Sequence, residues 1–227
     1  MRKVLGTTAV FTLVTVGGSM VLGLLIALAL NAKVRGTTFA RSAVFAPYVL
    51  SGVGVGLVWL FIFDPGYGVL AWLLRGIGQQ SPQWINDPQL SLVMVILVYV
   101  WKNLGYCAVV YLAGLQSLPK EVMEAASLDG ANGFRRFMSI SLPLLSPTTF
   151  FLLITTMLSS LQAFDLIRIM TPLGTGTSTL IYEAYLQAFG AYNRAGYSAA
   201  ISVVLFAILL VITVLQLRFV ERKVHYS

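Results

Sequence analysis

Six polar side chains fall within or at the ends of long apolar stretches, where a polar solute would need binding partners. They are Lys102, Asn103 and Tyr106 in one stretch, and Ser159, Gln162 and Asp165 at the end of another. An ionised side chain at the centre of a membrane costs about 2.5–3.5 kcal/mol on insertion scales, so such residues generally have a function. We expect the six to line a polar path. Structural alternatives are an ion pair between Lys102 and Asp165 and a hydrogen-bonded helix contact through Gln162.

Chemistry on a bound solute is not expected. The chain holds one histidine, His225, and one cysteine, Cys107. A membrane enzyme needs a cluster of nucleophile, base or metal ligands, and the scattered carboxylates do not supply one. No Gly-x-x-x-x-Gly-Lys-Ser/Thr phosphate cradle occurs. We therefore expect no metal, ATP or other cofactor to be bound by this chain itself.

Membrane-spanning helices are the elements that must position these side chains. Hydrophobic residues make up 58% of the 227 residues and charged residues only 10%, with a mean hydropathy of +0.85. A helix needs about 20 apolar residues to cross a hydrocarbon core of roughly 30 Å. Five stretches meet this length, at about 8–30, 43–63, 92–113, 144–164 and 197–217. Because none shows the alternation of a membrane β-strand, we expect one all-α polytopic domain over residues 1–227.

Basic residues gather in alternate loops, which predicts the orientation of the spans. They form three groups: Lys33, Arg35 and Arg41; Lys120, Arg135 and Arg136; and Arg218, Arg222 and Lys223. We expect these segments to be cytoplasmic and the loops at about 64–91 and 165–196 to face outward. A basic amino terminus would then lie outside, so a further span is expected before 8–30. The net charge of +7 includes no basic run longer than two residues, so nucleic acid is not expected as a partner.

Glycine and aromatic residues mark further features of the spans and outer loops. The run Gly52-x-Gly54-x-Gly56 indicates close helix packing or, alternatively, a broken helix lining the solute path. Tyr48 and Trp59 are expected to anchor the helices at the membrane interface. In the outer loops, we expect an amphipathic segment at 69–77, a flexible loop at 171–179 and a short helix at 180–189.

The loop at 117–141 is predicted to form two short helices. Pro119 suits a first helical position, and Gly130 suits the left-handed conformation that ends a helix. Asn132 can cap the second helix, and Pro143 opens the next span. Force applied to this loop would therefore pass directly into the following membrane helix.

The spacing within this loop resembles a known transporter signature. Glu124-Ala125-Ala126, Gly130, and Ile140-x-Leu142-Pro143 are similar to the EAA loop of the membrane-spanning subunits of ABC importers. The resemblance covers nearly the whole chain. Trp101-Lys102-Asn103, Gln162-Ala163-Phe164-Asp165 and the segment 196–216 resemble permeases of the carbohydrate group. Within that group, the tail 216–226 is most similar to the UgpA-type permease of glycerol-3-phosphate importers.

The resemblance implies a type I importer permease in the bacterial cytoplasmic (inner) membrane, with the EAA loop and the C-terminus in the cytoplasm. The coupling residues that it implies are Glu121, Glu124, Ala125, Ala126, Asp129, Gly130 and Ala131. The implied partners are a second homologous permease, two ATPase subunits that bind ATP and Mg²⁺, an external solute-binding protein, and membrane lipid. Glycerol-3-phosphate, a glycerophosphodiester and a sugar remain alternative solutes. A secondary transporter or channel would need buried carboxylates or repeated broken helices, and the chain offers few of either.

Overall fold

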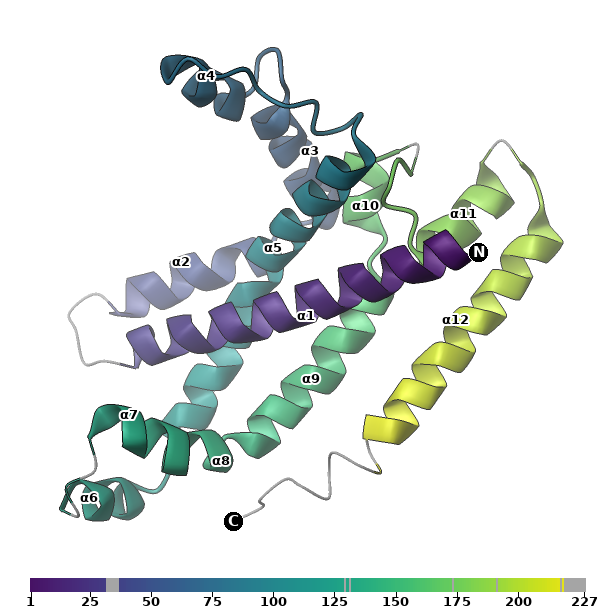
Figure 1. The fold of residues 1–227 in the computed structure, drawn as a ribbon. Coiled ribbons are helices and arrows are strands. Elements are labelled where there is room, and N and C mark those ends of the chain that lie inside the picture. The colour runs from purple at the N-terminus through teal and green to yellow at the C-terminus, as the bar shows by residue number, and fades with distance from the viewer. Residues whose placement is uncertain are drawn as a thin grey trace.

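The computed structural model describes residues 1–31, 37–128, 130, 132–172, 174–190, 192–216 and 218. Each regular element in these ranges is a helix (Figure 1). Four of them are long and apolar enough to cross a membrane: α1 (Arg2–Leu30), α5 (Pro88–Gln116), the segment Ser146–Met170, and α12 (Ala195–Leu215). The charged residues Lys33, Arg35, Arg222 and Lys223, together with His225, lie outside the described ranges. The expectation of an all-helical membrane protein is confirmed.

The stretch 43–63, expected as one span, consists of two helices, α2 (Thr37–Val49) and α3 (Gly52–Phe63), bent by 98°. Pro47 lies in the last turn of α2 and cannot donate a backbone hydrogen bond. Ser51 has φ −56° and ψ 133°, which is not helical, and α3 begins at the next residue, Gly52. The break therefore lies directly before the glycine run.

The stretch 144–164 also differs from a single straight helix. The segment Ser146–Met170 contains α9 (Ser146–Leu161) and a short helix α10 (Asp165–Met170). Gln162 ends α9, and Phe164 has the non-helical angles φ −127° and ψ −59°. Asp165 therefore does not continue the helical face that carries Ser159.

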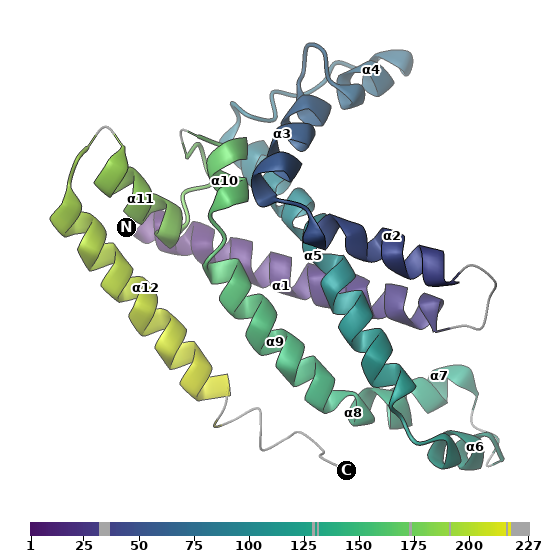
Figure 2. The ribbon, with the colours of Figure 1, turned by 180° about the vertical axis from the view of Figure 1, so that it is seen from behind.

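Helix α5 lies at the centre of the bundle and packs against α1, α2 and α9 (Figures 1 and 2). Its contact with α1 is close because Gly23 faces Cys107. A Cβ built on Gly23 would lie 2.5 Å from the Cys107 Cβ. Met94 and Val98 of α5, together with Phe11 of α1, are almost completely buried. These contacts set the distance between α1 and α5.

The loop helices gather at the two ends of the bundle (Figure 1). One end carries α4 (Val69–Gly76), α10 and α11 (Leu180–Phe189), and the other carries the chain from α6 to α8. Helix α11 is anchored because the Leu180 N–H donates to Thr8 Oγ1 at 2.9 Å. Tyr182 donates to the Pro172 carbonyl at 2.7 Å. The segment expected to be a flexible loop is thus held by hydrogen bonds at both of its ends.

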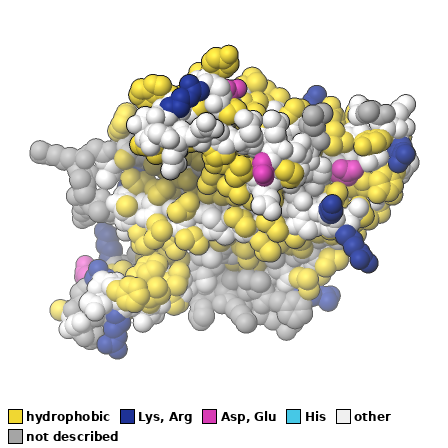
Figure 3. Space-filling model, turned by 45° about the horizontal axis from the view of Figure 1, so that its top comes forward, with side chains coloured by type: hydrophobic (Ala, Val, Ile, Leu, Met, Phe, Trp, Pro, Cys, Tyr) yellow, Lys and Arg dark blue, Asp and Glu magenta, His cyan; other side chains and the backbone are white. Residues whose placement is uncertain are grey.

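The surface carries many large hydrophobic side chains, as Figure 3 shows in yellow over the visible face. Leu13 on α1, Phe61 on α3 and Val203 on α12 are 68%, 59% and 67% exposed. Water does not favour such a surface, whereas lipid or another apolar subunit does. The arrangement fits a bundle that is enclosed by a membrane.

Candidate functional site

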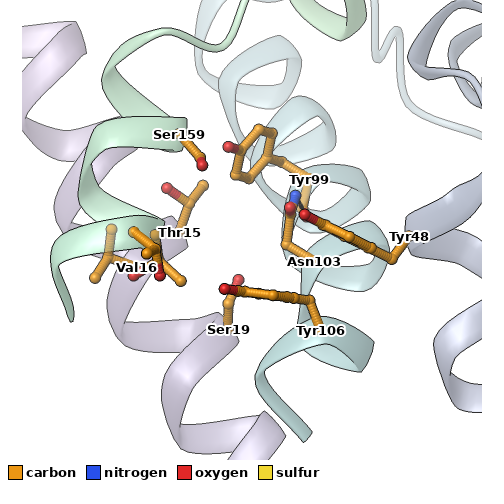
Figure 4. Close-up of a pocket in the computed structure, with 10 residues that line it drawn as sticks. Thr15, Val16, Ser19, Tyr48, Tyr99, Asn103, Tyr106 and Ser159 are labelled. Atoms are coloured by element: carbon orange, nitrogen blue, oxygen red, sulfur yellow. Dashed lines mark hydrogen bonds between the residues drawn. The ribbon is translucent and has the colours of Figure 1, made fainter. Parts of the chain in front are cut away.

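A cavity of about 250 Å³ lies between α1, α2, α5 and α9. Figure 4 shows its lining side chains directed toward a common space. The lining residues are Thr15, Val16, Ser19, Tyr48, Tyr99, Asn103, Tyr106, Thr155, Thr156 and Ser159. All except Val16 carry a hydroxyl or amide group, and none carries a charge. The cavity therefore offers a neutral, hydrogen-bonding lining.

Two tyrosine rings form an aromatic wall of this cavity. The Tyr48 and Tyr106 rings stack with centroids 4.9 Å apart and an interplanar angle of 19°. Tyr48 comes from the last turn of α2 and Tyr106 from the middle of α5. We refer to this pair as the aromatic wall. A flat apolar surface next to polar groups suits a solute that has both hydrocarbon and hydroxyl faces.

The polar groups of the lining differ in whether they already have a hydrogen-bond partner within the protein. Thr15 Oγ1 shares a hydrogen bond with Ser160 Oγ at 2.7 Å and also donates toward the Phe11 carbonyl. Asn103 Nδ2 donates to the Tyr99 carbonyl at 2.8 Å, which orients the amide. Ser19 is only 1% exposed, yet its Oγ has no hydrogen-bond partner in the described structure. A buried hydroxyl normally has a partner, so Ser19 is free to bond with a solute in the cavity.

The structure brings together three of the six residues predicted for the polar path. Asn103, Tyr106 and Ser159 line the cavity. Lys102, Gln162 and Asp165 do not line it. Gln162 is exposed at the end of α9.

The two charged members of the predicted path have separate contacts. Lys102 Nζ donates to the backbone carbonyl of Tyr48 at 2.8 Å. Asp165 lies beside the start of α3, where a Cβ built on Gly52 would be 3.3 Å from the Asp165 Cβ. Both residues are described, and no ion pair joins them. The suggested Lys102–Asp165 pairing is therefore replaced by the contact of Lys102 with α2.

The sequence did not predict Val16 or six lining residues with polar side chains, one of which, Tyr48, was assigned to the membrane interface. The others with polar side chains are Thr15 and Ser19 on α1, Tyr99 on α5, and Thr155 and Thr156 on α9. A signal was present, because residues four apart share a helix face. Thr15 and Ser19, Tyr99 and Asn103, and Thr155 and Ser159 all have this spacing. Hydroxyl or amide pairs on three apolar spans mark the cavity lining.

The loop 117–141 folds into the helices that its turn residues predict. Helix α6 covers Lys120–Leu128, and Gly130 has φ +75°, in the left-handed region that glycine favours. Asn132 Oδ1 accepts from the Arg135 N–H at 2.8 Å and so caps α7 (Gly133–Arg136). Asp129 and Ala131 lie outside the described residues. The loop is thus a pair of short helices joined by a glycine turn.

The surface of α6 and α7 combines acidic and apolar side chains. Glu121, Glu124 and Ala125 are exposed, whereas Ala126 is 6% exposed. Leu128 is 89% exposed and Phe134 is 71% exposed. Exposed apolar side chains rimmed by charged ones are typical of a protein–protein contact.

The loop is joined to the cavity through a succession of short helices. After α7 the chain continues as a π-helix, η1 (Phe137–Ser141), then as α8 (Leu142–Leu144), and then as α9. Ser141 Oγ donates to Met123 Sδ at 3.9 Å, a contact between η1 and α6. Because α9 also carries Thr155, Thr156 and Ser159, only α8 and Leu145 separate the loop from the helix that bears part of the cavity lining.

A family with the description "Binding-protein-dependent transport system inner membrane component" matches residues 19–226. The chain belongs to this family. It is therefore a multi-pass inner membrane permease component of a binding-protein-dependent ABC importer, and the expectation that it is not itself an enzyme is confirmed.

Relatives of known name agree with this assignment. The sn-glycerol-3-phosphate transport system permease protein UgpA of Agrobacterium fabrum is 40% identical over 226 residues, which are 98% of this chain and 76% of the relative. The protein of the same name from Yersinia pestis is 36% identical over 224 residues, covering 97% of this chain and 75% of the relative. These identities support the resemblance to UgpA-type permeases.

Solved structures show the same fold at lower identity. A chain of a bacterial ABC transporter involved in the import of the acidic polysaccharide alginate has a TM-score of 0.84 and 22% identity, covering 96% of this chain and 79% of its own length. A chain of an amino acid ABC transporter with histidines has a TM-score of 0.62 and 17% identity, covering 96% and 92%. The helical arrangement is therefore that of ABC importer permeases.

Proposed function

We propose that this chain forms half of a solute path that opens and closes under the action of ATP hydrolysis in a partner chain. The observation that carries the proposal is that α9 joins the loop 117–141 to a cavity lined by uncharged polar side chains. Solute would pass through the space between α1, α2, α5 and α9. A second, homologous permease would supply the other half of the path, and an external binding protein would deliver the solute.

The proposed solute is glycerol-3-phosphate, a glycerophosphodiester or a related sugar. Its support is the identity with UgpA-type permeases and the hydroxyl-rich lining. A solute with several hydroxyl groups can exchange hydrogen bonds with Ser19, Asn103 and Ser159, while its carbon backbone lies on the aromatic wall. At about 30 Å³ per water molecule, the cavity has room for about eight waters, so it would hold one small solute or one sugar unit.

The proposed coupling residues lie in the loop 117–141. They are Glu121, Glu124, Ala125, Ala126, Asp129, Gly130 and Ala131, as the resemblance to the EAA loop implies. Exposed Leu128 and Phe134 would add apolar contacts with the ATPase. In this arrangement the loop and the C-terminus lie in the cytoplasm, and the partner ATPase subunits hold ATP and Mg²⁺.

A transporter or channel that is not driven by ATP is the second candidate. The observation in its favour is the break between α2 and α3, since secondary transporters often build their sites at broken helices. Such proteins commonly place an ionisable group within the path. Among the described residues, the cavity lining includes none.

The first test compares two glycines of the same loop. Gly130 has φ +75°, which proline cannot adopt, whereas Gly133 begins α7 and has open space where a Cβ would be. The chain, co-expressed with its permease and ATPase partners, would be placed in lipid nanodiscs with solute-loaded binding protein. We expect Gly130→Pro to abolish solute-stimulated ATP hydrolysis while the basal rate and membrane insertion remain. Gly133→Ala should keep the stimulation.

The same assay identifies the solute and separates the two candidates. Glycerol-3-phosphate, a glycerophosphodiester and a disaccharide would be compared as stimulating ligands. Adding Glu124→Lys tests the acidic part of the loop. If no ATPase associates with the chain, or if Gly130→Pro and Glu124→Lys leave the stimulation unchanged, the proposal of ATP-driven import fails and the second candidate gains support.

A further inference from the structure

The two halves of the broken span pack mainly against different helices. Helix α2 packs on α5 at Gly105, where an added Cβ would overlap the Val44 carbonyl oxygen and lie 2.9 Å from its carbonyl carbon. Helix α3 packs on α10 at Gly56, where an added Cβ would lie 2.9 Å from Ile169 Cγ2. Helix α3 also contacts α5, because the Trp59 ring packs against the Trp101 ring with centroids 5.3 Å apart. Residues 50–51 therefore form a bend between two helices that both lie against α5.

Lys102 holds the end of α2 at this junction. Its Nζ donates to the Tyr48 carbonyl at 2.8 Å and lies 5.5 Å from the centroid of the Tyr48 ring. The last four carbonyls of a helix have no partner within the helix, and a cation near that end is favourable. One side chain of α5 thus contacts both the backbone and the ring of Tyr48.

The contact fixes a part of the cavity that Lys102 does not line. Tyr106 lies one turn after Lys102 on α5, and its ring stacks on Tyr48. If α2 moved away from α5 at its end, the aromatic wall would separate. Lys102 thus adds to the contacts with the Phe45 and Tyr106 rings that set the position of Tyr48 in the cavity.

We propose that Lys102 is a positioning residue that latches the end of α2 to α5 and thereby holds the aromatic wall of the cavity closed. The effect on solute rests on the solute path proposed above, whereas the effect on α2 does not. With the latch in place, the bend between α2 and α3 is fixed at residues 50–51. Without it, the end of α2 swings away from α5 about these residues, and the aromatic wall opens.

Spin-label distances test the latch without any transport. One pair, Phe39→Cys on α2 and Phe61→Cys on α3, reports on the bend, because these positions are 81% and 59% exposed. The control pair is Val21→Cys on α1 and Leu97→Cys on α5, positions that are 60% and 53% exposed. It reports on the distance between α1 and α5, which the contact of Lys102 with Tyr48 does not set. Cys107 is fully buried and can be kept.

The chain in nanodiscs should give a single narrow distance for the first pair with Lys102 present. Lys102→Met should add a second population of distances, and Lys102→Arg should restore the single one because it keeps a charged donor. The control pair should not change. If Lys102→Met does not insert, Lys102→Gln serves, since its shorter side chain cannot reach Tyr48. An unchanged first pair in these variants overturns the proposal.

The dependence of ATPase activity on solute concentration then distinguishes a positioning role of Lys102 from direct contact of Lys102 with the solute. In the assembled importer, Lys102→Met should raise the half-maximal solute concentration for ATPase stimulation about tenfold, as the loss of one charge-assisted hydrogen bond would, with a smaller change in the maximal rate. This increase should be similar for anionic and neutral ligands. A loss confined to phosphate ligands, with unchanged label distances, would show that Lys102 binds the solute and would overturn the latch. If the wild type shows no stimulation, the proposed function fails while the distances still decide the latch.

Discussion

Gly105 is the position where one added methyl group should disturb the cavity most directly. It lies where α5 meets the backbone of α2 at Val44, four residues before Tyr48. In Gly105→Ala, the new Cβ would overlap the Val44 carbonyl, so α2 must move away from α5. Overpacking of this kind costs about 1–3 kcal/mol of stability. The displaced backbone is the one that carries Tyr48, so the change should reach the aromatic wall.

The functional effect follows from the loss of that stacking. An aromatic pair is worth about 0.5–1.5 kcal/mol beyond its buried area. If the solute depends on the stacked arrangement, its affinity should fall by about two- to thirteenfold, since about 1.4 kcal/mol corresponds to a factor of ten. We expect the half-maximal solute concentration for ATPase stimulation to rise by this factor, and the unfolding midpoint in detergent titration to fall.

Gly17→Ala is the matched control because a Cβ built on Gly17 has no neighbour within 4 Å. It should leave solute dependence unchanged and, within a helix, should not reduce stability. If Gly105→Ala is as stable as Gly17→Ala and has the same solute dependence, the close approach of α2 to Gly105 does not position the aromatic wall. A loss of stability with unchanged solute dependence would instead show that the position of Tyr48 does not affect solute binding.

Two further changes test particular hydrogen bonds. Ser19→Ala removes a buried hydroxyl that has no protein partner. Solute affinity, measured by solute-stimulated ATPase activity, should therefore fall up to about tenfold, with little change in stability to detergent unfolding. A fall in stability alone would contradict a role of Ser19 in solute binding. Thr8→Val removes the acceptor of the Leu180 N–H and should destabilise the anchoring of α11 by about 1 kcal/mol. The loss would be detected as faster amide hydrogen exchange in residues 180–189. Thr8→Ser keeps the hydroxyl and should keep the wild-type exchange rate.

Local turn chemistry allowed the loop helices to be predicted from the sequence. Gly130 and Asn132 act on their own neighbours, so their types indicate the end of α6 and the start of α7. Likewise, α11 covers the predicted range 180–189. The ends of α6 and α7 depend on a few adjacent residues, whereas α11 is in addition held by the distant Thr8.

Contacts between distant segments could not be predicted in the same way. Thr15 and Ser160 are 145 residues apart in sequence, yet their hydroxyls are bonded at 2.7 Å. Their meeting depends on how α1 crosses α9, which hydropathy does not specify. Asp165 is the converse case, because it was expected on the polar path with Ser159 and the interruption before α10 separates the two residues. Spacing arguments fail wherever a span is broken.

The neutral lining has a consequence for how tightly a solute would be held. A hydrogen bond between uncharged groups contributes only about 0.5–1.5 kcal/mol net, and bonds to charged groups contribute about 1.5–3 kcal/mol. Lys102 donates to the end of α2, and Asp165 lies beside the start of α3, so neither charged residue lines the cavity. The lining is therefore left with uncharged groups of modest affinity. A path supplied by a binding protein needs such a lining, because a solute that bound tightly between the helices would not leave it.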